Sequence, residues 1–377
     1  MSERMNPRWR ILHTESSLGW GGQERRIMAE VGGFGRRGCD VWVGAPVEAR
    51  LHQRAQVAGF HTVPLGTGKL QFPFSVLKLA AWLRRERIDI LSPHSSRDAW
   101  IAGIAGRLAR VPLIVRYRHF DVPIRHPWMS RTVYGTLADH VITTSPRITE
   151  TLRGLFRLPE SRVSTIATGI DLERFHPEGP KAQLHFAGLE PGVPLIGMVG
   201  IFRRAKGHPI LLEAAARLRK EGFAAHYLLV GEGPMLEATR RRVQELGLQS
   251  EVTFTDERED IPEILRSLSL LVMPSLHEGI PQVGLQALAC GTPVVGSDVG
   301  GIPSIIRPGE TGRLVPTEDP AALASRIREV FAEPEETRRL SAQGRRLVEQ
   351  EHGLERMLDR VQEIYLRSLG GLAGVPG

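Results

Sequence analysis

The sequence predicts an α/β protein composed of two doubly wound domains, and three observations support this fold class. Short apolar runs of strand length alternate with longer helical segments, which is typical of a parallel sheet covered on both faces. The chain has 377 residues, more than a single hydrophobic core of usual size holds. The alternation breaks once, at residues 171–192, where prolines and glycines gather as they do in a linker.

In the first half, each apolar run is short enough to be a buried parallel strand. The expected strands are Trp9–His13, Val41–Gly44, Ile88–Leu91, Leu113–Val115 and His140–Thr143. The expected helices are Gly21–Arg37, Val76–Arg87, Ala99–Ala109 and Arg147–Phe156. The segment Thr168–Asp171 closes this half and is expected to be structural.

The same alternation restarts after the linker. The expected strands are Leu195–Val199, Ala225–Val230, Val252–Phe254, Leu268–Met273 and Pro293–Gly296. The expected helices are Pro209–Glu221, Met235–Leu246, Ile261–Arg266, one following Glu278, Pro320–Phe331, Pro334–Glu349 and Leu354–Leu369. We therefore predict domains at residues 1–178 and 179–353, followed by a C-terminal segment at 354–377.

Composition and charge limit the partners. The net charge is +7, and only five of the 49 basic residues are lysine. Such a surface suits nucleic acid, anionic lipid or phosphorylated substrates, although compositional bias explains it equally well. No zinc-type Cys/His spacing and no RNA-binding aromatic motif occurs, so nucleic acid is not expected. Two cysteines, no signal-like apolar run and no window of membrane-spanning length predict a cytoplasmic protein.

The stretch Ser275–Val295 contains the residue types that bind a diphosphate sugar. Glu278 lies in a short loop before a predicted helix, whose first N–H groups lack partners inside it and whose dipole is positive there. A diphosphate binds well at such an end. Gln286 follows one to two turns later. Taken alone, an ordinary loop-to-helix turn explains this stretch about equally well.

Lys206 follows the first predicted strand of the second half, beside Arg203 and Arg204. Parallel sheets bind ligands at the carboxyl ends of their strands. Cations at this place would neutralise a diphosphate leaving group. The alternative is a solvated basic turn.

Other strand ends carry weaker candidates. Gly231 and Gly233 permit a tight turn whose backbone approaches a ligand closely. An ordinary strand-to-helix turn explains the two glycines equally well. Gly21 and Gly22 open the first helix and could direct N–H groups to a phosphate or an acceptor. His119 could hydrogen-bond a transferred sugar or stabilise charge, but a lone histidine is as often structural.

Taken in order, these motifs resemble the family-4 retaining glycosyltransferases of GT-B fold, in which two Rossmann-like domains face a central cleft. The resemblance covers nearly the whole chain. Its motifs are GGQE (Gly21–Glu24), TGIDLERFHP (Thr168–Pro177), RRAKGH, VGEGP, PSLHEGIPQVGLQALACGTPVV and SDVGGIPSIIRPGETGRLVP (Ser297–Pro316).

The resemblance implies a role for each matching residue. Glu278 matches the first Glu of the E-x7-E motif, which contacts the donor sugar, and Gly279 and Ile280 match positions whose amides hold sugar hydroxyls or phosphate. Lys206, with Arg203 or Arg204, matches the basic pair that binds the diphosphate. Gly21 and Gly22 match the phosphate-proximal loop of the N-terminal domain, the acceptor side. The 179–353 domain would bind the nucleotide sugar, and Leu354–Leu369 would cross back to the N-terminal domain. Neither a divalent metal nor a further cofactor is implied.

Four positions depart from the family pattern. Gln286 replaces the second Glu, which is expected to hold the ribose hydroxyls, so the charge-assisted bond is lost. Ile201 stands where many members have an arginine. Thr168 replaces a frequent Asn, and Ser304 replaces a frequent Glu.

The expected activity is transfer of a sugar from a nucleotide diphosphate sugar to an acceptor hydroxyl with retention of configuration. The acceptor would be a glycan, lipid-linked or lipopolysaccharide, as in cell envelope polysaccharide biosynthesis. Arginines of the first half suggest peripheral contact with the anionic inner face of a membrane. The alternatives are a GT-B sugar-nucleotide epimerase, a phosphorylase, or a non-catalytic subunit that binds a nucleotide sugar.

Overall fold

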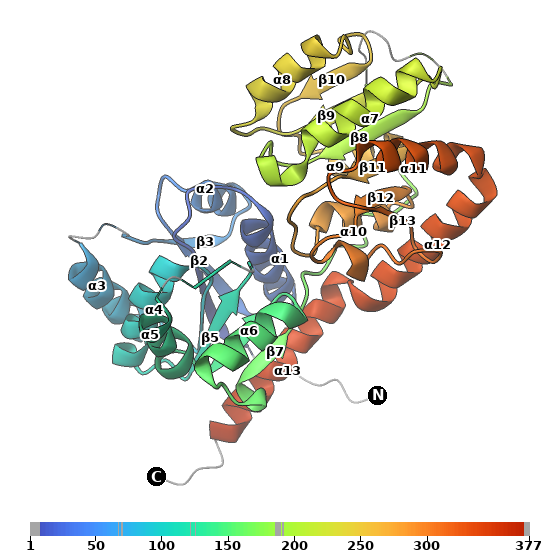
Figure 1. Ribbon diagram of the computed structural model, residues 1–377. Coiled ribbons are helices and arrows are strands. Elements are labelled where there is room, and N and C mark those ends of the chain that lie inside the picture. The colour runs from blue at the N-terminus through green and yellow to red at the C-terminus, as the bar shows by residue number, and fades with distance from the viewer. Residues whose placement is uncertain are drawn as a thin grey trace. The chain divides into compact units, whose positions relative to one another are not determined.

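The computed structural model describes residues 8–66, 68, 71–120, 122–124, 126–184, 190 and 192–372, with side chains up to residue 370. These residues form two compact units (Figure 1). The N-terminal unit runs to Gly169 and includes the chain from Leu354 onward, and the C-terminal unit is Ile170–Gly353. The sequence-based boundaries lie after residues 178 and 353, and residues 373–377 of the predicted last segment fall outside the described part.

A parallel sheet of order β3-β2-β1-β4-β5-β6-β7 forms the centre of the N-terminal unit. Its strands are β1 (Arg10–Thr14), β2 (Asp40–Ala45), β3 (His61–Pro64), β4 (Ile90–Pro93), β5 (Leu113–Arg118), β6 (His140–Thr143) and β7 (Val163–Thr165). Its helices are α1 (Gly22–Arg36), α2 (Arg50–Val57), α3 (Phe72–Arg85), α4 (Ser96–Ala109), α5 (Pro127–Arg131), a π-helical turn (Thr132–Leu137), α6 (Pro146–Phe156) and α13 (Leu354–Leu372). The strand order reverses between β1 and β4, which is the switch point of a doubly wound sheet.

The C-terminal unit repeats this architecture with the order β10-β9-β8-β11-β12-β13. Its strands are β8 (Leu195–Val199), β9 (His226–Val230), β10 (Val252–Thr255), β11 (Leu270–Met273), β12 (Val294–Ser297) and β13 (Arg313–Val315). Its helices are α7 (His208–Lys220), α8 (Leu236–Glu245), α9 (Ile261–Ser267), α10 (Gln282–Ala289), α11 (Pro320–Ala332) and α12 (Pro334–Glu351). Here the strand order reverses between β8 and β11.

The predicted strands and helices are all present, with ends that differ by a few residues. Sequence reasoning missed β3, β7 and β13, together with α2 and α5. Each of the three missed strands lies at an edge of its sheet. An edge strand has one solvated side, so it lacks the apolar run that identifies a buried strand. In β3 only Val63 is buried.

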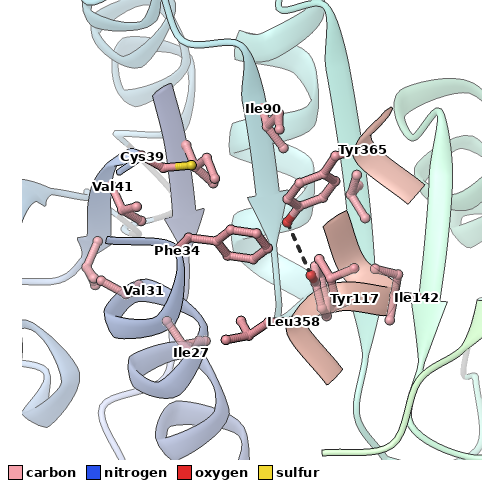
Figure 2. Packing of buried hydrophobic residues seen from close by; sticks show 14 of the residues in the cluster. Ile27, Val31, Phe34, Cys39, Val41, Ile90, Tyr117, Ile142, Leu358 and Tyr365 are labelled. Carbon is pink, nitrogen blue, oxygen red and sulfur yellow. Dashed lines mark hydrogen bonds between the residues drawn. The ribbon is translucent and has the colours of Figure 1, made fainter. Parts of the chain in front are cut away.

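Helix α13 completes the core of the N-terminal unit, as Figure 2 shows. Its buried side chains recur at helical spacing and pack with those of α1 and the sheet. A Cβ on Gly33 would lie 2.3 Å from the side chain of Leu358, so a larger residue there would force Leu358 to shift. Arg37 fixes the other side of α13 through Asp359 at 2.7 Å. Residues 354–372 therefore belong structurally to the N-terminal unit.

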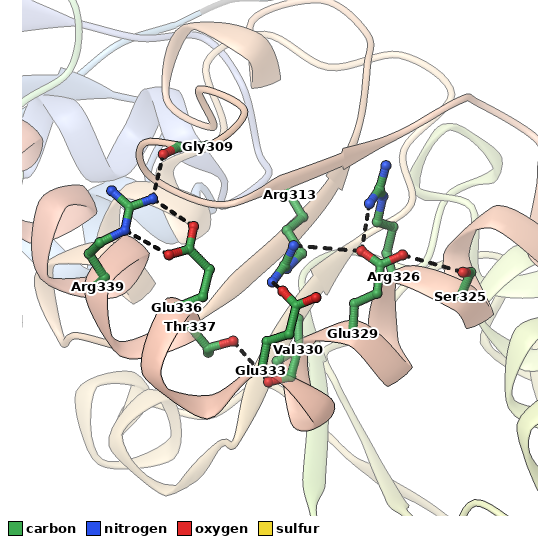
Figure 3. A network of polar contacts seen from close by, with 10 residues as sticks. All are labelled: Gly309, Arg313, Ser325, Arg326, Glu329, Val330, Glu333, Glu336, Thr337 and Arg339. Carbon is green, nitrogen blue, oxygen red and sulfur yellow. Dashed lines mark hydrogen bonds and ion pairs between the residues drawn. The ribbon is translucent and has the colours of Figure 1, made fainter.

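A surface ion network joins the last elements of the C-terminal unit (Figure 3). Arg313 on β13 pairs with Glu333 at 2.5 Å and with Glu329 at 3.5 Å. Arg339 of α12 pairs with Glu336 and donates to the carbonyl of Gly309 at 2.8 Å. The Arg313 side chain is only 14% exposed, so its two ion pairs hold β13 against α11 and the start of α12, whereas the exposed Arg339–Glu336 pair adds little stability.

Candidate functional site

The loops that follow β8 and β11 flank the switch point of the C-terminal sheet, and they bring Lys206 and Glu278 together. The ammonium nitrogen of Lys206 lies 2.5 Å from Oε2 of Glu278. The Ser275 hydroxyl donates to the same carboxylate oxygen at 3.3 Å. The two charged side chains are 27% and 16% exposed, so both remain accessible to a ligand.

Backbone contacts lock these two loops in place. The 3₁₀ turn Arg204–Lys206 follows β8, and the N–H of Leu276 donates to the carbonyl of Ala205 at 2.8 Å. Gly207 ends this turn with a left-handed φ of +73°. A Cβ there would lie 1.8 Å from the carbonyl oxygen of Pro274, which excludes every other residue type. The basic loop and the acidic loop are thus one rigid assembly.

A third loop encloses the backbone next to Glu278. Gly300 has a φ of +61°, and a Cβ on it would lie 1.9 Å from the carbonyl oxygen of Glu278. The N–H of Gly301 donates to that carbonyl at 3.3 Å. Gly279, by contrast, has open space where a Cβ would be. The glycines after β12 therefore hold Glu278 and leave the Gly279 backbone uncovered on that side.

The glycines after β9 pack against the loop after β8. Cβ atoms on Gly231 and Gly233 would lie 2.2 Å from the carbonyl of Gly200 and 2.6 Å from that of Phe202. The N–H of Phe202 also donates to the carbonyl of Glu232 at 2.8 Å. Loop packing accounts for both glycines, and their predicted contact with a donor stays a prediction.

The other residues of this unit that are predicted to bind the sugar donor lie near Lys206 or Glu278 in the sequence. Helix α10 begins at Gln282, so Gly279 and Ile280 lie in the loop before it. Gln286 is partly exposed, and Arg203 and Arg204 are exposed. Within the described part of the chain, the side chains of these three residues have no hydrogen-bond partner. Their polar groups are available to a ligand.

In the N-terminal unit, the loop after β1 is organised by a buried carboxylate, Glu15. It accepts hydrogen bonds from the N–H groups of Ser16 at 2.8 Å and Ser17 at 2.7 Å, and from the Gln23 amide. Burial, reinforced by repulsion from Asp98, raises the pKa of Glu15 to about 7. Glu15 had no motif to indicate it in the sequence.

The predicted phosphate loop at Gly21 and Gly22 is the start of α1. The N–H of Gly21 donates to Oε2 of Glu24 at 2.8 Å, so Glu24 serves as a helix cap. This is the structural role that the helix dipole favours for an acid in the first turn. A contact of Gly21 or Gly22 with a phosphate stays a prediction, and for Gly21 it requires a different N–H partner.

Asp98 occupies the other side of the N-terminal switch point, on α4. It accepts hydrogen bonds at 2.9 Å from the Thr14 hydroxyl and from the N–H groups of His94 and Ser95. Burial raises the pKa of Asp98. The Ser-x-x-Asp spacing of Ser95 and Asp98 is a capping-box signal that sequence reasoning could have used.

His119, just after β5, is partly exposed and is not alone. Its Nε2 lies 2.9 Å from Nδ1 of His94, and Nε2 of His94 lies 2.9 Å from Nδ1 of His13. The neighbouring Asp121 lies outside the described residues. The sequence indicated His119 but neither of its two partners. In the described ranges, no group of three or more His, Cys, Asp or Glu side chains is arranged to hold a metal ion.

Comparison with known proteins identifies the class to which this fold and these loops belong. The family model Glycosyltransferase Family 4 matches residues 20–174, and the model Glycosyl transferases group 1 matches residues 181–347. A D-inositol 3-phosphate glycosyltransferase of Mycobacterium sp. strain JLS is 31% identical over 310 residues, covering 75% of this chain and 68% of the relative. The chain belongs to glycosyltransferase family 4, and it is a transferase of glycosyl groups.

Solved structures show the same fold over almost the whole chain. A glycosyltransferase from Rickettsia africae matches with a TM-score of 0.81 and 19% identity, covering 96% of this chain and 99% of that chain. Anabaena HepE, solved with UDP and glucose, matches with a TM-score of 0.78 and 18% identity, covering 94% and 98%. The predicted two-domain α/β GT-B fold is thereby confirmed.

Proposed function

We propose that the C-terminal unit binds a nucleoside diphosphate sugar at the switch point between β8 and β11. The contact of Lys206 with Glu278 is the observation that supports this most. A lysine ammonium has three donors, and Glu278 takes one, so two remain for diphosphate oxygens. The carboxylate of Glu278 has further lone pairs that can accept from sugar hydroxyls. One assembly thus offers a cation for phosphate beside an acceptor for sugar.

In the proposed reaction, the bond between the anomeric carbon and the diphosphate oxygen breaks as the acceptor oxygen bonds to that carbon on the same face. Negative charge develops on the leaving diphosphate, where Lys206 with Arg203 or Arg204 stabilises it. The acceptor proton passes to the departing phosphate oxygen, so no side chain is needed as a base. The amides of Gly279 and Ile280 hold sugar or phosphate oxygens, and Gln286 holds the ribose.

The donor to test first is UDP-glucose. Anabaena HepE, which shares this fold, has been solved with UDP-glucose. Gln286 is compatible with a ribose because its amide both donates and accepts a hydrogen bond. A panel of UDP, GDP and ADP sugars would be screened for thermal stabilisation. At about 100 times the dissociation constant, a ligand adds roughly 2.7 kcal/mol of stability.

Transfer then distinguishes the proposed activity from its alternatives. With a stabilising donor, we expect acceptor-dependent release of nucleoside diphosphate and a product whose anomeric configuration matches the donor by NMR. Turnover of the donor without acceptor would indicate an epimerase, and dependence on inorganic phosphate a phosphorylase. Donor binding with neither transfer nor hydrolysis would indicate a non-catalytic subunit.

We propose that the acceptor is a lipid-linked or lipopolysaccharide glycan at the cytoplasmic face of a membrane. On α3, Phe74 and Leu77 are 69% and 63% exposed, next to the exposed Lys78, Arg84 and Arg85. Apolar and basic side chains on one helix suit the surface of an anionic bilayer. Of the helices described, none is long and apolar enough to span a membrane.

Sedimentation with phosphatidylglycerol vesicles tests this contact. We expect binding that weakens as salt increases, and that is lost in a Phe74→Ser/Leu77→Ser variant. The control is Val57→Ser, since Val57 is also exposed but lies on α2. Equal binding to neutral vesicles, or no binding at low salt, would contradict the membrane proposal and leave the transfer activity unaffected.

A further inference from the structure

Three histidines of the N-terminal unit form a continuous stack from the core to the surface. His13 lies on β1, His94 follows β4 and His119 follows β5. The ring centroids are 5.2 Å apart for the first pair and 5.1 Å for the second. Tyr117 stacks on the middle ring at 4.3 Å. His13 and His94 are buried, whereas His119 is partly exposed.

All three imidazoles are neutral at physiological pH. Burial lowers the pKa of His13 to about 4 and holds the pKa values of His94 and His119 well below their usual range. The charged and titratable groups that surround the stack are Arg26 and Glu30 on α1, Asp98 on α4, Arg116 and Tyr117 on β5, and Tyr365 on α13. The two arginines reinforce the effect of burial, and Glu30 opposes it at His13.

A neutral imidazole has one N–H donor and one lone pair, so the stack allows only two hydrogen-bond patterns. In the outward pattern, Nδ1–H of His13 donates to His94, Nδ1–H of His94 donates to His119, and Nδ1–H of His119 is left to donate. In the inward pattern every donor is reversed, and His119 presents a lone pair. The inner end of the stack decides between them.

At the inner end, Nε2 of His13 is buried without a partner among the described residues, and so is Nη2 of Arg26. Arg26 is itself buried and bonds Glu30 through Nε at 2.8 Å and the carbonyl of Ile166 through Nη1 at 2.7 Å. The inward pattern would add a buried N–H without an acceptor at Nε2 of His13, in addition to that of Arg26. The outward pattern leaves a lone pair at Nε2 instead, and a buried N–H without a partner is rarer in folded proteins than a buried acceptor without one.

We propose that His13 and His94 are positioning residues that fix His119 in its Nδ1–H form, so that its exposed edge donates a hydrogen bond to an oxygen of a sugar substrate. This role rests on the proposed transferase function of the chain. A neutral donor of fixed direction selects a hydroxyl or ring oxygen. It also stays neutral and in one tautomer throughout the physiological pH range, whereas an unsupported histidine exchanges tautomers and becomes charged as the pH falls toward its usual pKa.

The first test needs no substitution in the core. In protein labelled with nitrogen-15 histidine, the ring shifts distinguish the Nδ1–H from the Nε2–H form, and an exposed-site His119→Gln variant assigns the signal. We expect Nδ1–H for His119, with no titration between about pH 8 and about pH 5.5. An Nε2–H signal, or titration near the usual histidine pKa, would overturn the proposal whether or not the enzyme is a transferase.

The second test compares two substitutions of the middle ring. A glutamine at position 94 can still donate to Nε2 of His119, whereas leucine cannot. With any donor that the enzyme turns over, we expect His94→Leu to lower kcat/KM about 10-fold through loss of one oriented hydrogen bond, and His94→Gln to recover most of it. His61→Leu, at the exposed edge strand β3, is the control and should change nothing.

The two tests separate the possible failures. An Nδ1–H signal together with a His119→Ala variant of unchanged kcat/KM would overturn the substrate contact. Equal losses in His94→Leu and His94→Gln would overturn the positioning role, because glutamine keeps the donor. Should His94→Leu fail to fold, the wild-type shifts and the His94→Gln kinetics still decide the question.

Discussion

At the scale of single residues, the contact of Lys206 with Glu278 is the place in the C-terminal unit where we propose that the diphosphate binds. Each residue is the ion-pair partner of the other, so neither charge is left unpaired in a partly buried environment. The pairing keeps the ammonium at the end of β8, oriented before the substrate arrives. Such preorganisation is what makes a charge effective in a transition state.

Replacing Lys206 with alanine should therefore affect turnover more than folding. We expect kcat to fall roughly 100- to 1000-fold, because the charge that stabilises the leaving diphosphate is lost. Steady-state kinetics with the best donor measures this, and circular dichroism checks the fold. Lys220→Ala, at the exposed end of α7, is the matched control. Near-normal kcat in Lys206→Ala would refute the assigned role.

Substitution of Gln286 tests the proposed ribose contact through a gain of nucleotide affinity, whereas the Lys206 variant tests its role through a loss of activity. A carboxylate at this position accepts from two ribose hydroxyls with charge assistance, which adds about 1 kcal/mol over a neutral amide. Gln286→Glu should thus bind nucleoside diphosphate about 5-fold more tightly in a calorimetric titration. Gln286→Leu should bind more weakly. Unchanged affinity in both variants would remove this residue from the ribose site.

At the scale of elements, loops at the carboxyl ends of β8, β9, β11 and β12 hold one another by backbone contacts. Glycines are needed at these contacts because the opposing atoms are carbonyl groups, which cannot move aside as a side chain can. Glycine at these positions therefore permits a rigid cluster of loops around Glu278. The glycines that look like a nucleotide-binding motif are explained by this packing alone.

Gly300→Ala should disturb the site through this packing. A Cβ at 1.9 Å from the Glu278 carbonyl forces the loop to shift, in addition to the left-handed φ of +61°. Gly309 has a φ of +74° but no atom within 4 Å of a Cβ, so Gly309→Ala isolates the cost of the backbone conformation, about 1 kcal/mol. We expect Gly300→Ala to lose more stability than Gly309→Ala in urea unfolding.

Donor affinity provides the second measurement for this pair. Gly300→Ala should weaken donor binding about 10-fold or more, since Glu278 moves with its backbone, and Gly309→Ala should leave it unchanged. If both variants bound the donor as tightly as the wild type, the loop after β12 would not position Glu278.

At the scale of the whole molecule, buried neutral histidines make the fold sensitive to acid. Burial lowers the pKa of His13, His140 and His208 to about 4. Because these folded-state values lie below the unfolded value, the stability they contribute is present above about pH 6.5 and is lost as the pH falls toward 4. Glu15, whose pKa is raised to about 7, and Asp98, whose pKa burial also raises, act in the opposite sense and offset part of this loss.

The free energy of unfolding should accordingly be lower at about pH 5 than at about pH 7.5, by roughly 2 kcal/mol for each such histidine before the offset from the two carboxyl groups. Urea denaturation at the two pH values measures the difference. His208→Phe should reduce this pH dependence, because phenylalanine retains the stacking on Phe202 and does not titrate. Equal stability at both pH values would contradict the burial of neutral histidines.

The sequence by itself determined which segments are strands and helices in the buried part of each unit, and it placed Lys206, Glu278 and His119 at strand ends. These features are local. The apolar pattern of a segment predicts whether it is buried, and a ligand-binding residue comes directly after its strand in the sequence. Solvated edge strands such as β3 lack that pattern and were missed.

Only the tertiary structure decided which of these strand ends meet. Lys206 contacts Glu278 because β8 is the neighbour of β11, and His13, His94 and His119 stack because β1, β4 and β5 lie in that order. Strand order is a property of the folded sheet, in which residues far apart in the chain become adjacent. No local pattern in the chain encodes it, so the partners of each charged or polar group appear only once the sheet has formed.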